Sequence, residues 1–178
     1  MFYIPQSAIH YGMLIDQVPF GTPAQVAARR DAFLQAGGWD TTVAMNYDDI
    51  NAWVRLADFG DAIFINDCLA YRMVWSGGYD QKMSINRRMA LNLTLKEVIY
   101  QRVSEGYRDR IPPLAAIGQY LHLHWGLVAL RQRQVATGLS LLVAGALSPQ
   151  AWQLLAQARQ LRSNPQADHR VPRTVLVP

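Results

Sequence analysis

The stretch that decides the fold is Gly37-Gly38-Trp39-Asp40, followed closely by Tyr47-Asp48-Asp49-Ile50-Asn51-Ala52-Trp53-Val54-Arg55-Leu56. A double glycine lets the backbone turn where a side chain would clash. Trp53 and Leu56 fall on one stripe of a helix that starts near the two aspartates. The N-terminal dipole of a helix stabilises negative charge, which offsets the repulsion between neighbouring carboxylates. The pattern predicts a turn, a short polar loop and a helix over residues 49–59.

Two aspartates at a helix start also have an ordinary structural explanation. In this interpretation Asp48 or Asp49 is the N-cap residue, the helix covers residues 50–59, and Gly60 ends it. For an isolated Asp-Asp pair that explanation is the better one. A functional role is therefore inferred from the neighbouring motifs.

Four signals occur in order along this part of the chain. They are Arg29-Arg30 with a short helix, Gly37-Gly38-Trp39-Asp40, Tyr47-Asp48-Asp49 leading into Trp53-Val54-Arg55-Leu56, and Leu69-Ala70-Tyr71-Arg72. Together they resemble the second half of the catalytic domain of family 2 glycosyltransferases, which have the GT-A fold. The resemblance covers residues 19–84 and, more weakly, the helical tail. It implies an α/β fold, with a partial GT-A-like mixed sheet in the first half and a helical C-terminal region.

The resemblance also implies a reaction and a site. Such a protein is an inverting glycosyltransferase, in which a carboxylate takes the proton of an acceptor hydroxyl as that oxygen attacks a nucleotide-diphospho-sugar. Counting back from Trp53 places this general base at Asp49. The residues implied for substrate binding are Asp48, Gly38, Asp40, Arg72 and Trp53.

The donor side departs from the family pattern. Val74 stands where many relatives have the histidine of a Tyr-Arg-x-His strand, and the chain contains no Asp-x-Asp motif. The family implies a divalent cation, Mg²⁺ or Mn²⁺, but its main ligands are absent here, so no metal site is assigned. We expect the nucleotide-binding half of the domain to be missing. The chain is then a fragment, one half of a split enzyme, or a relative that has lost catalysis, and alone it is expected to be inactive.

The expected partners follow from the same resemblance. They are a nucleotide sugar, a glycan or lipid-linked acceptor, and either a second copy or a partner chain that supplies the missing half. The expected location is cytoplasmic, with peripheral association at the inner membrane face as an option. The alternative from a different functional class is a non-catalytic scaffold or partner-binding module that uses an exposed sheet edge.

Composition narrows the remaining classes. The 178 residues carry a formal net charge of +4, and every basic residue except Lys82 and Lys96 is an arginine. No basic stripe with interleaved aromatic residues appears. A nucleic-acid partner is therefore not expected. The single cysteine, Cys68, excludes an internal disulfide. His122 and His124 are two apart on an expected helix, so their side chains point away from each other and cannot share a metal ion.

Patterning predicts the following elements. One or two short strands joined at Tyr11-Gly12 are expected over residues 1–19. Thr22-Pro23 suits the start of a helix, residues 24–28 equally suit a short buried strand, and the resemblance favours the strand. Helices are expected over 30–36, 49–59, 85–105, 112–131, 137–147 and 149–161, with a hairpin-like strand region over 61–75. The expected organisation is a half-domain over 1–84, a helical extension packed on it over 85–163, and a loose tail over 164–178.

Overall fold

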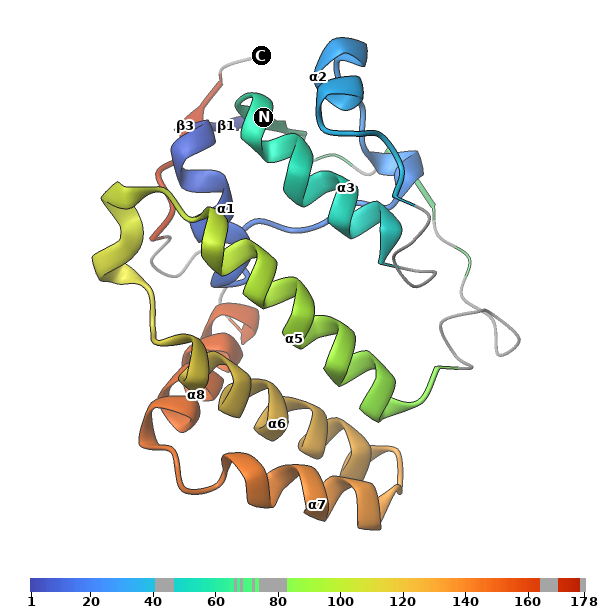
Figure 1. Cartoon of the computed structure of the whole chain (residues 1–178), viewed down its shortest axis with the longest axis vertical. Coiled ribbons are helices and arrows are strands. Elements are labelled where there is room, and N and C mark those ends of the chain that lie inside the picture. Colours follow the sequence, from blue (N-terminus) through green and yellow to red (C-terminus); the bar gives the residue numbers. More distant parts are fainter. Residues whose placement is uncertain are drawn as a thin grey trace. The chain divides into compact units, whose positions relative to one another are not determined.

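The structure is a computed structural model that describes residues 1–40, 47–65, 67, 69–71, 73, 83–163 and 170–176 (Figure 1). The chain forms two compact units. The first contains Met1–Gln81, Ile99–Asp109 and His169–Pro178, and the second contains Lys82–Val98 and Arg110–Asp168. The first unit holds a small sheet with helices, and the second is helical.

The sheet of the first unit has three short strands in the order β2-β1-β3. The strands are β1 (Phe2–Ile4), β2 (Ala62–Phe64) and β3 (Thr174–Val175), and β1 pairs antiparallel with both neighbours. Phe2 lies opposite Phe64, and their rings stack at 5.2 Å. The α/β content is confirmed, but the described sheet is small and antiparallel and differs from the GT-A-like mixed sheet that the sequence led us to expect.

The helices of the first unit include those next to the Gly37-Gly38 and Asp48-Asp49 motifs. They are α1 (Gln6–Leu14), α2 (Arg30–Gln35), α3 (Asp48–Leu56) and the 3₁₀ helices Pro23–Gln25, Ala57–Phe59 and Glu105–Arg110. The expected helices over 30–36 and 49–59 are confirmed. The expected strand over 24–28 is wrong, because the Gln25 side chain accepts hydrogen bonds from the Thr22 amide and hydroxyl and closes a 3₁₀ turn.

The N-terminal stretch was also predicted incorrectly in part. Only β1 is a strand there, and Tyr11-Gly12 lies inside α1 instead of at a turn. Helix α1 is buried at every residue from Ala8 to Leu14. A helix buried on all sides has no polar face, so its sequence lacks the amphipathic period that distinguishes a helix from a strand.

The C-terminal residues pack into the first unit. Thr174–Val175 forms the edge strand β3, and the Val171 side chain is buried. The Val171 N–H donates to Gln17 Oε1 at 3.2 Å, and the Arg173 guanidinium lies 4.9 Å from the centre of the Phe2 ring. The expectation of a loose tail over 164–178 therefore does not hold for residues 170–176.

The second unit is built from α6 (Leu114–Arg131), α7 (Val135–Gly145), α8 (Pro149–Ser163) and the first part of α5 (Ile85–Arg102). All four helices were expected. Tyr120, Leu121 and Leu123 of α6 pack with Ala151 and Leu155 of α8 in the core. The Ser148 hydroxyl accepts the Ala151 N–H at 3.2 Å, which confirms that Ser148 caps α8.

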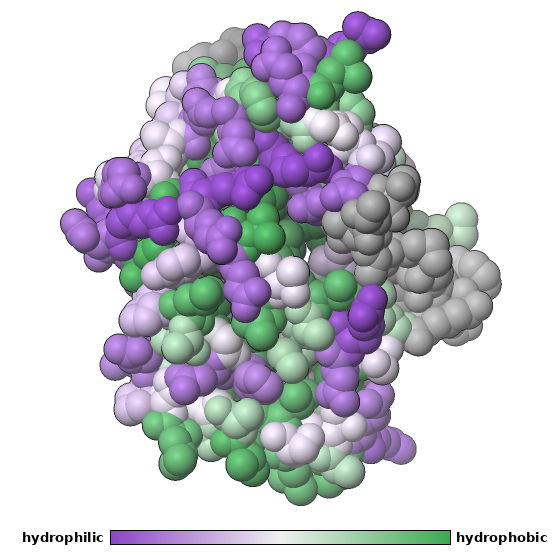
Figure 2. Space-filling model, viewed as in Figure 1, coloured by the Kyte–Doolittle hydropathy of each residue, from purple (hydrophilic) through white to green (hydrophobic). Residues whose placement is uncertain are grey.

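Helices α6 and α7 approach closely at two glycines. A Cβ built on Gly138 would lie 2.7 Å from Leu130 side-chain atoms and 3.1 Å from the Gly126 carbonyl oxygen. A Cβ on Gly126 would lie 2.8 Å from Leu142 and 3.1 Å from the Gly138 carbonyl oxygen. One face of α7 therefore packs closely against α6. Figure 2 shows hydrophobic residues along the lower edge of the view, where Figure 1 shows α7.

Candidate functional site

The Gly37-Gly38 pair forms the turn that the sequence predicts. Gly37 has a φ of 85° and Gly38 a φ of 60°, both in the left-handed region that favours glycine. The Gly38 N–H donates to the Phe33 carbonyl oxygen at 2.9 Å, and the Gly37 N–H donates to that of Leu34 at 3.0 Å. These bonds close the C-terminal end of α2.

Arg55 connects this turn to helix α3. Its Nη1 donates to the Ala36 carbonyl oxygen at 2.6 Å, and its Nη2 donates to that of Gly38 at 2.8 Å. A guanidinium presents parallel donors in a fixed plane, so one side chain serves both carbonyls at the negative end of α2. Arg55 is a positioning residue that the sequence did not identify. Its only signal was a charged residue in an otherwise apolar run of α3.

An aromatic row runs from the turn to α3. The Trp39 ring meets Phe33 edge-on at 5.4 Å and Trp53 edge-on at 5.3 Å. Trp53 is buried, and its indole N–H donates to the Gly21 carbonyl oxygen at 2.7 Å, whereas Trp39 is 45% exposed. Trp53, which was predicted for substrate binding, is therefore a buried residue that packs under Trp39. Trp39 is the more exposed of the two tryptophans.

Asp48 and Asp49 are the first two residues of α3 and are half-buried. The Asp49 carboxylate accepts the Ile50 N–H at 2.7 Å. The N-cap position belongs to Tyr47, so the expectation that one of the two aspartates is the N-cap is wrong. Both lie instead in the first turn, where the helix dipole favours negative charge.

The remaining predicted residues are placed less completely. Asp40 is half-buried and directly precedes residues 41–46, which lie outside the described part of the chain. Arg72 and Val74 also lie outside the described residues. The structure thus brings Gly38 and Trp53 together through Arg55 and Trp39, and it puts both aspartates on the helix that carries Trp53 and Arg55.

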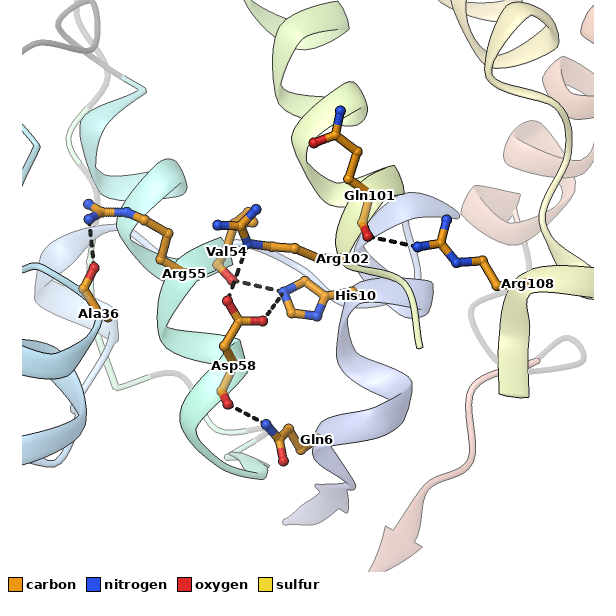
Figure 3. A network of polar contacts seen from close by, with 9 residues as sticks. All are labelled: Gln6, His10, Ala36, Val54, Arg55, Asp58, Gln101, Arg102 and Arg108. Atoms are coloured by element: carbon orange, nitrogen blue, oxygen red, sulfur yellow. Dashed lines mark hydrogen bonds and ion pairs between the residues drawn. The ribbon is translucent and has the colours of Figure 1, made fainter. Parts of the chain in front are cut away.

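A second polar cluster in the first unit surrounds His10 (Figure 3). His10 is buried, and its Nε2 lies 2.8 Å from the Val54 carbonyl oxygen and 3.7 Å from the Asp58 carboxylate. Arg102 Nε donates to the other Asp58 oxygen at 3.2 Å. Burial lowers the pKa of His10 below its usual value, which favours the neutral ring. Because the Val54 carbonyl oxygen can only accept, Nε2 is the nitrogen that carries the hydrogen in this contact. The cluster joins α1, α3 and the end of α5. Because its members are far apart in sequence, no local pattern could have predicted it.

Comparison with protein-family models, with curated proteins and with solved structures found no match for this chain. Among the described residues, no group of three or more His, Cys, Asp or Glu side chains could hold a metal ion. Asp48 and Asp49 provide only two neighbouring carboxylates.

Proposed function

We propose that the first unit is the acceptor side of an inverting glycosyltransferase and that Asp49 is its general base. The observation that carries this proposal is the pair of hydrogen bonds from Arg55 to Ala36 and Gly38. These bonds hold two of the four motifs that carry the resemblance, the glycine turn and helix α3, against each other. Asp49 lies in the first turn of α3, the helix that also carries Trp53 and Arg55.

The proposed step is a single displacement. The acceptor hydroxyl oxygen attacks the anomeric carbon of a nucleotide-diphospho-sugar from the face opposite the diphosphate. As the new C–O bond forms, the bond to the diphosphate oxygen breaks, and the nucleoside diphosphate leaves with the electron pair. The hydroxyl proton passes to an oxygen of the Asp49 carboxylate, which must lie within hydrogen-bond reach of that hydroxyl.

The donor is proposed to bind residues that another chain or a further segment supplies. Support comes from the sheet edge at β2. In the described part of the chain β2 has a strand on one side only. Ile63 of β2 is 62% exposed, and Ile65, one residue beyond the end of β2, is 52% exposed. An exposed apolar edge strand pairs readily with a strand from elsewhere. We propose that the partner covers this edge and places the donor opposite Asp49.

The test uses the tagged chain purified from its own cells together with the proteins that copurify with it. Release of nucleoside diphosphate is measured from uridine-, guanosine- and thymidine-diphosphate sugars, with a glycan extract as acceptor. Asp49→Asn is expected to lower turnover by about 10²- to 10⁴-fold and to leave donor binding nearly unchanged. The matched control is Asp31→Asn, which removes an exposed carboxylate from the first turn of α2.

The result also separates the two classes of function. Full turnover in Asp49→Asn would remove Asp49 from the mechanism. A preparation that retains its partner but releases no nucleoside diphosphate from any donor would favour the non-catalytic scaffold.

A further inference from the structure

The outward side of α7 is apolar along its whole length. Its inward residues Gly138, Leu141 and Gly145 are buried. The outward residues are Val135, Ala136, Leu139, Ser140, Val143 and Ala144, all exposed. The one hydroxyl among them, that of Ser140, donates to the Thr137 carbonyl oxygen at 2.9 Å. This half of the helix therefore presents hydrocarbon with no charged group, which is the opposite of an ordinary solvent-facing helix surface.

The apolar surface continues around the corner into α8. Leu147 is 96% exposed, and Trp152 is 46% exposed at the start of α8. The Trp152 indole N–H donates to the Ala146 carbonyl oxygen at 2.9 Å, so its one polar group is satisfied within the protein. We define the α7 face as Val135, Leu139, Val143, Leu147 and Trp152. Its three α7 members recur every four residues, as one stripe of a helix requires.

The charged residues of α6, α7 and α8 are all arginines. The second unit contains nine basic and two acidic residues, a formal charge of +7, whereas the first unit has an excess of acidic residues. No acidic residue occurs between Asp109 and Asp168. Arg131 and Arg133 are exposed directly before α7, and Arg159 is exposed on α8. Hydrocarbon with flanking arginines and no carboxylates suits a surface that is itself apolar inside and anionic at its rim.

We propose that the α7 face lies on an anionic lipid membrane, with α7 parallel to the bilayer surface. In this arrangement Val135, Leu139 and Val143 enter the boundary of the acyl chains, and Trp152 sits at the level of the headgroups. Arg131 and Arg133 contact lipid phosphates. The proposal is independent of the glycosyltransferase proposal, since it involves no residue of the Asp49 site.

Length and bend agree with surface binding. Helix α7 has 11 residues and is about 16 Å long at the usual rise per residue, whereas a hydrocarbon core is about 30 Å thick. No single described helix is long and apolar enough to cross a membrane. Only two helices taken together, Val135–Gly145 and Pro149–Gln160, have the length and hydropathy of a membrane span. The chain bends by 117° between them.

A second copy of the chain is a poorer occupant for this face. Protein interfaces place complementary charges at their rims. Two α7 faces brought together would find only arginines among the charged residues of α6, α7 and α8 that the structure describes. An anionic bilayer supplies the missing negative charge, whereas a second copy adds more positive charge.

The test is flotation of the full chain with lipid vesicles. Vesicles of phosphatidylcholine with about 30% phosphatidylglycerol, an anionic lipid, are compared with vesicles of pure phosphatidylcholine. The chain is expected to float with the anionic vesicles and much less with the neutral ones. The double variant Leu139→Gln/Val143→Gln is expected to bind about tenfold or more weakly, because it withdraws two apolar side chains from the bilayer.

The first unit offers a matched control. Leu34 and Val175 are 57% and 76% exposed, close to the 55% and 75% of Leu139 and Val143. Leu34→Gln/Val175→Gln is therefore expected to bind vesicles like the unaltered chain. Arg131→Gln/Arg133→Gln is expected to lose the preference for anionic vesicles, and Arg29→Gln/Arg30→Gln is expected to keep it. Circular dichroism confirms that each variant retains its helices.

Three outcomes would overturn the proposal. The chain could fail to float with anionic vesicles, or the two Leu/Val double variants could float equally well. Light scattering could also reveal a dimer that Leu139→Gln/Val143→Gln dissociates, with no vesicle binding by either form. That last result would assign the face to a second copy.

Discussion

The guanidinium of Arg55 donates to the Gly38 carbonyl oxygen at 2.8 Å, across a separation of 17 residues in sequence. Its other terminal nitrogen bonds Ala36, so a single side chain holds the end of α2 against α3. The turn and the two aspartates are therefore coupled through the position of α3. Loss of Arg55 is expected to disturb both.

Replacing Arg55 is expected to destabilise the first unit. Arg55→Ala removes two charge-assisted hydrogen bonds from a partly buried site, at a cost of about 2–4 kcal/mol. Arg55→Lys retains the charge, but an ammonium group lacks the planar pair of donors that bonds both carbonyls. Its loss of unfolding free energy should therefore be smaller than that of Arg55→Ala. Urea unfolding followed by tryptophan fluorescence measures both. Arg30→Ala, on the exposed surface of α2, is the control and should change the unfolding free energy by less than about 0.5 kcal/mol. Equal midpoints for the Arg30 and Arg55 variants would contradict the coupling.

His10 should make the first unit less stable in mild acid. Burial is the largest influence on this side chain and lowers its pKa below the usual 6.5, against the opposing influences of the hydrogen bond to Val54 and the charge of Asp58. Between the lowered pKa of folded His10 and pH 6.5, the unfolded chain therefore binds more protons than the folded chain. The stabilisation is fully present above pH 6.5 and is lost as the pH falls towards the lower folded pKa.

The measurement is the unfolding free energy of the chain and of His10→Gln between pH 7.5 and 5.5. The glutamine amide can still donate to the Val54 carbonyl oxygen but does not titrate in this range. We expect the unaltered chain to lose more stability than His10→Gln on acidification. Parallel pH profiles for the two proteins would exclude His10 as the cause.

Local sequence signals predicted most helices and the central turn. Some residues have conformational preferences that depend little on their neighbours, so the turn or helix start at these positions could be predicted locally. They are Gly37-Gly38, Pro113 and Ser148-Pro149. Helix α1 was missed because it is buried on all sides, and β3 because a two-residue edge strand leaves almost no pattern. At the candidate site the sequence predicted a role for the two aspartates, and that role stays a prediction. The sequence did not identify Arg55 as the connecting residue, since its acceptors are carbonyl oxygens of another helix.

Gly145→Ala should destabilise the second unit, although alanine is the better helix former. In an open helix this change gains about 1 kcal/mol. Here the added Cβ would lie 2.5 Å from the Gln119 carbonyl oxygen and 2.9 Å from Leu123, so α7 must move away from α6. We expect a net loss of about 1–3 kcal/mol, measured by thermal unfolding with circular dichroism. Gly106→Ala is the control, because nothing lies within 4 Å of its added Cβ. A higher midpoint for Gly145→Ala than for the unaltered chain would contradict the close packing of α6 on α7.

The chain without a partner is expected to bind neither a nucleotide sugar nor Mn²⁺ measurably. The proposal assigns the donor to residues supplied from elsewhere, and the sequence contains no Asp-x-Asp to bridge a cation and a diphosphate. By the resemblance, Val74 stands where many family 2 glycosyltransferases have a histidine, so no imidazole ligand is expected at this position. Isothermal titration calorimetry with uridine- and guanosine-diphosphate sugars, with and without Mn²⁺, measures this directly. The same titrations after addition of the copurifying partner are the positive control. Micromolar donor binding by the 178-residue chain alone would contradict the division of the site between two parts.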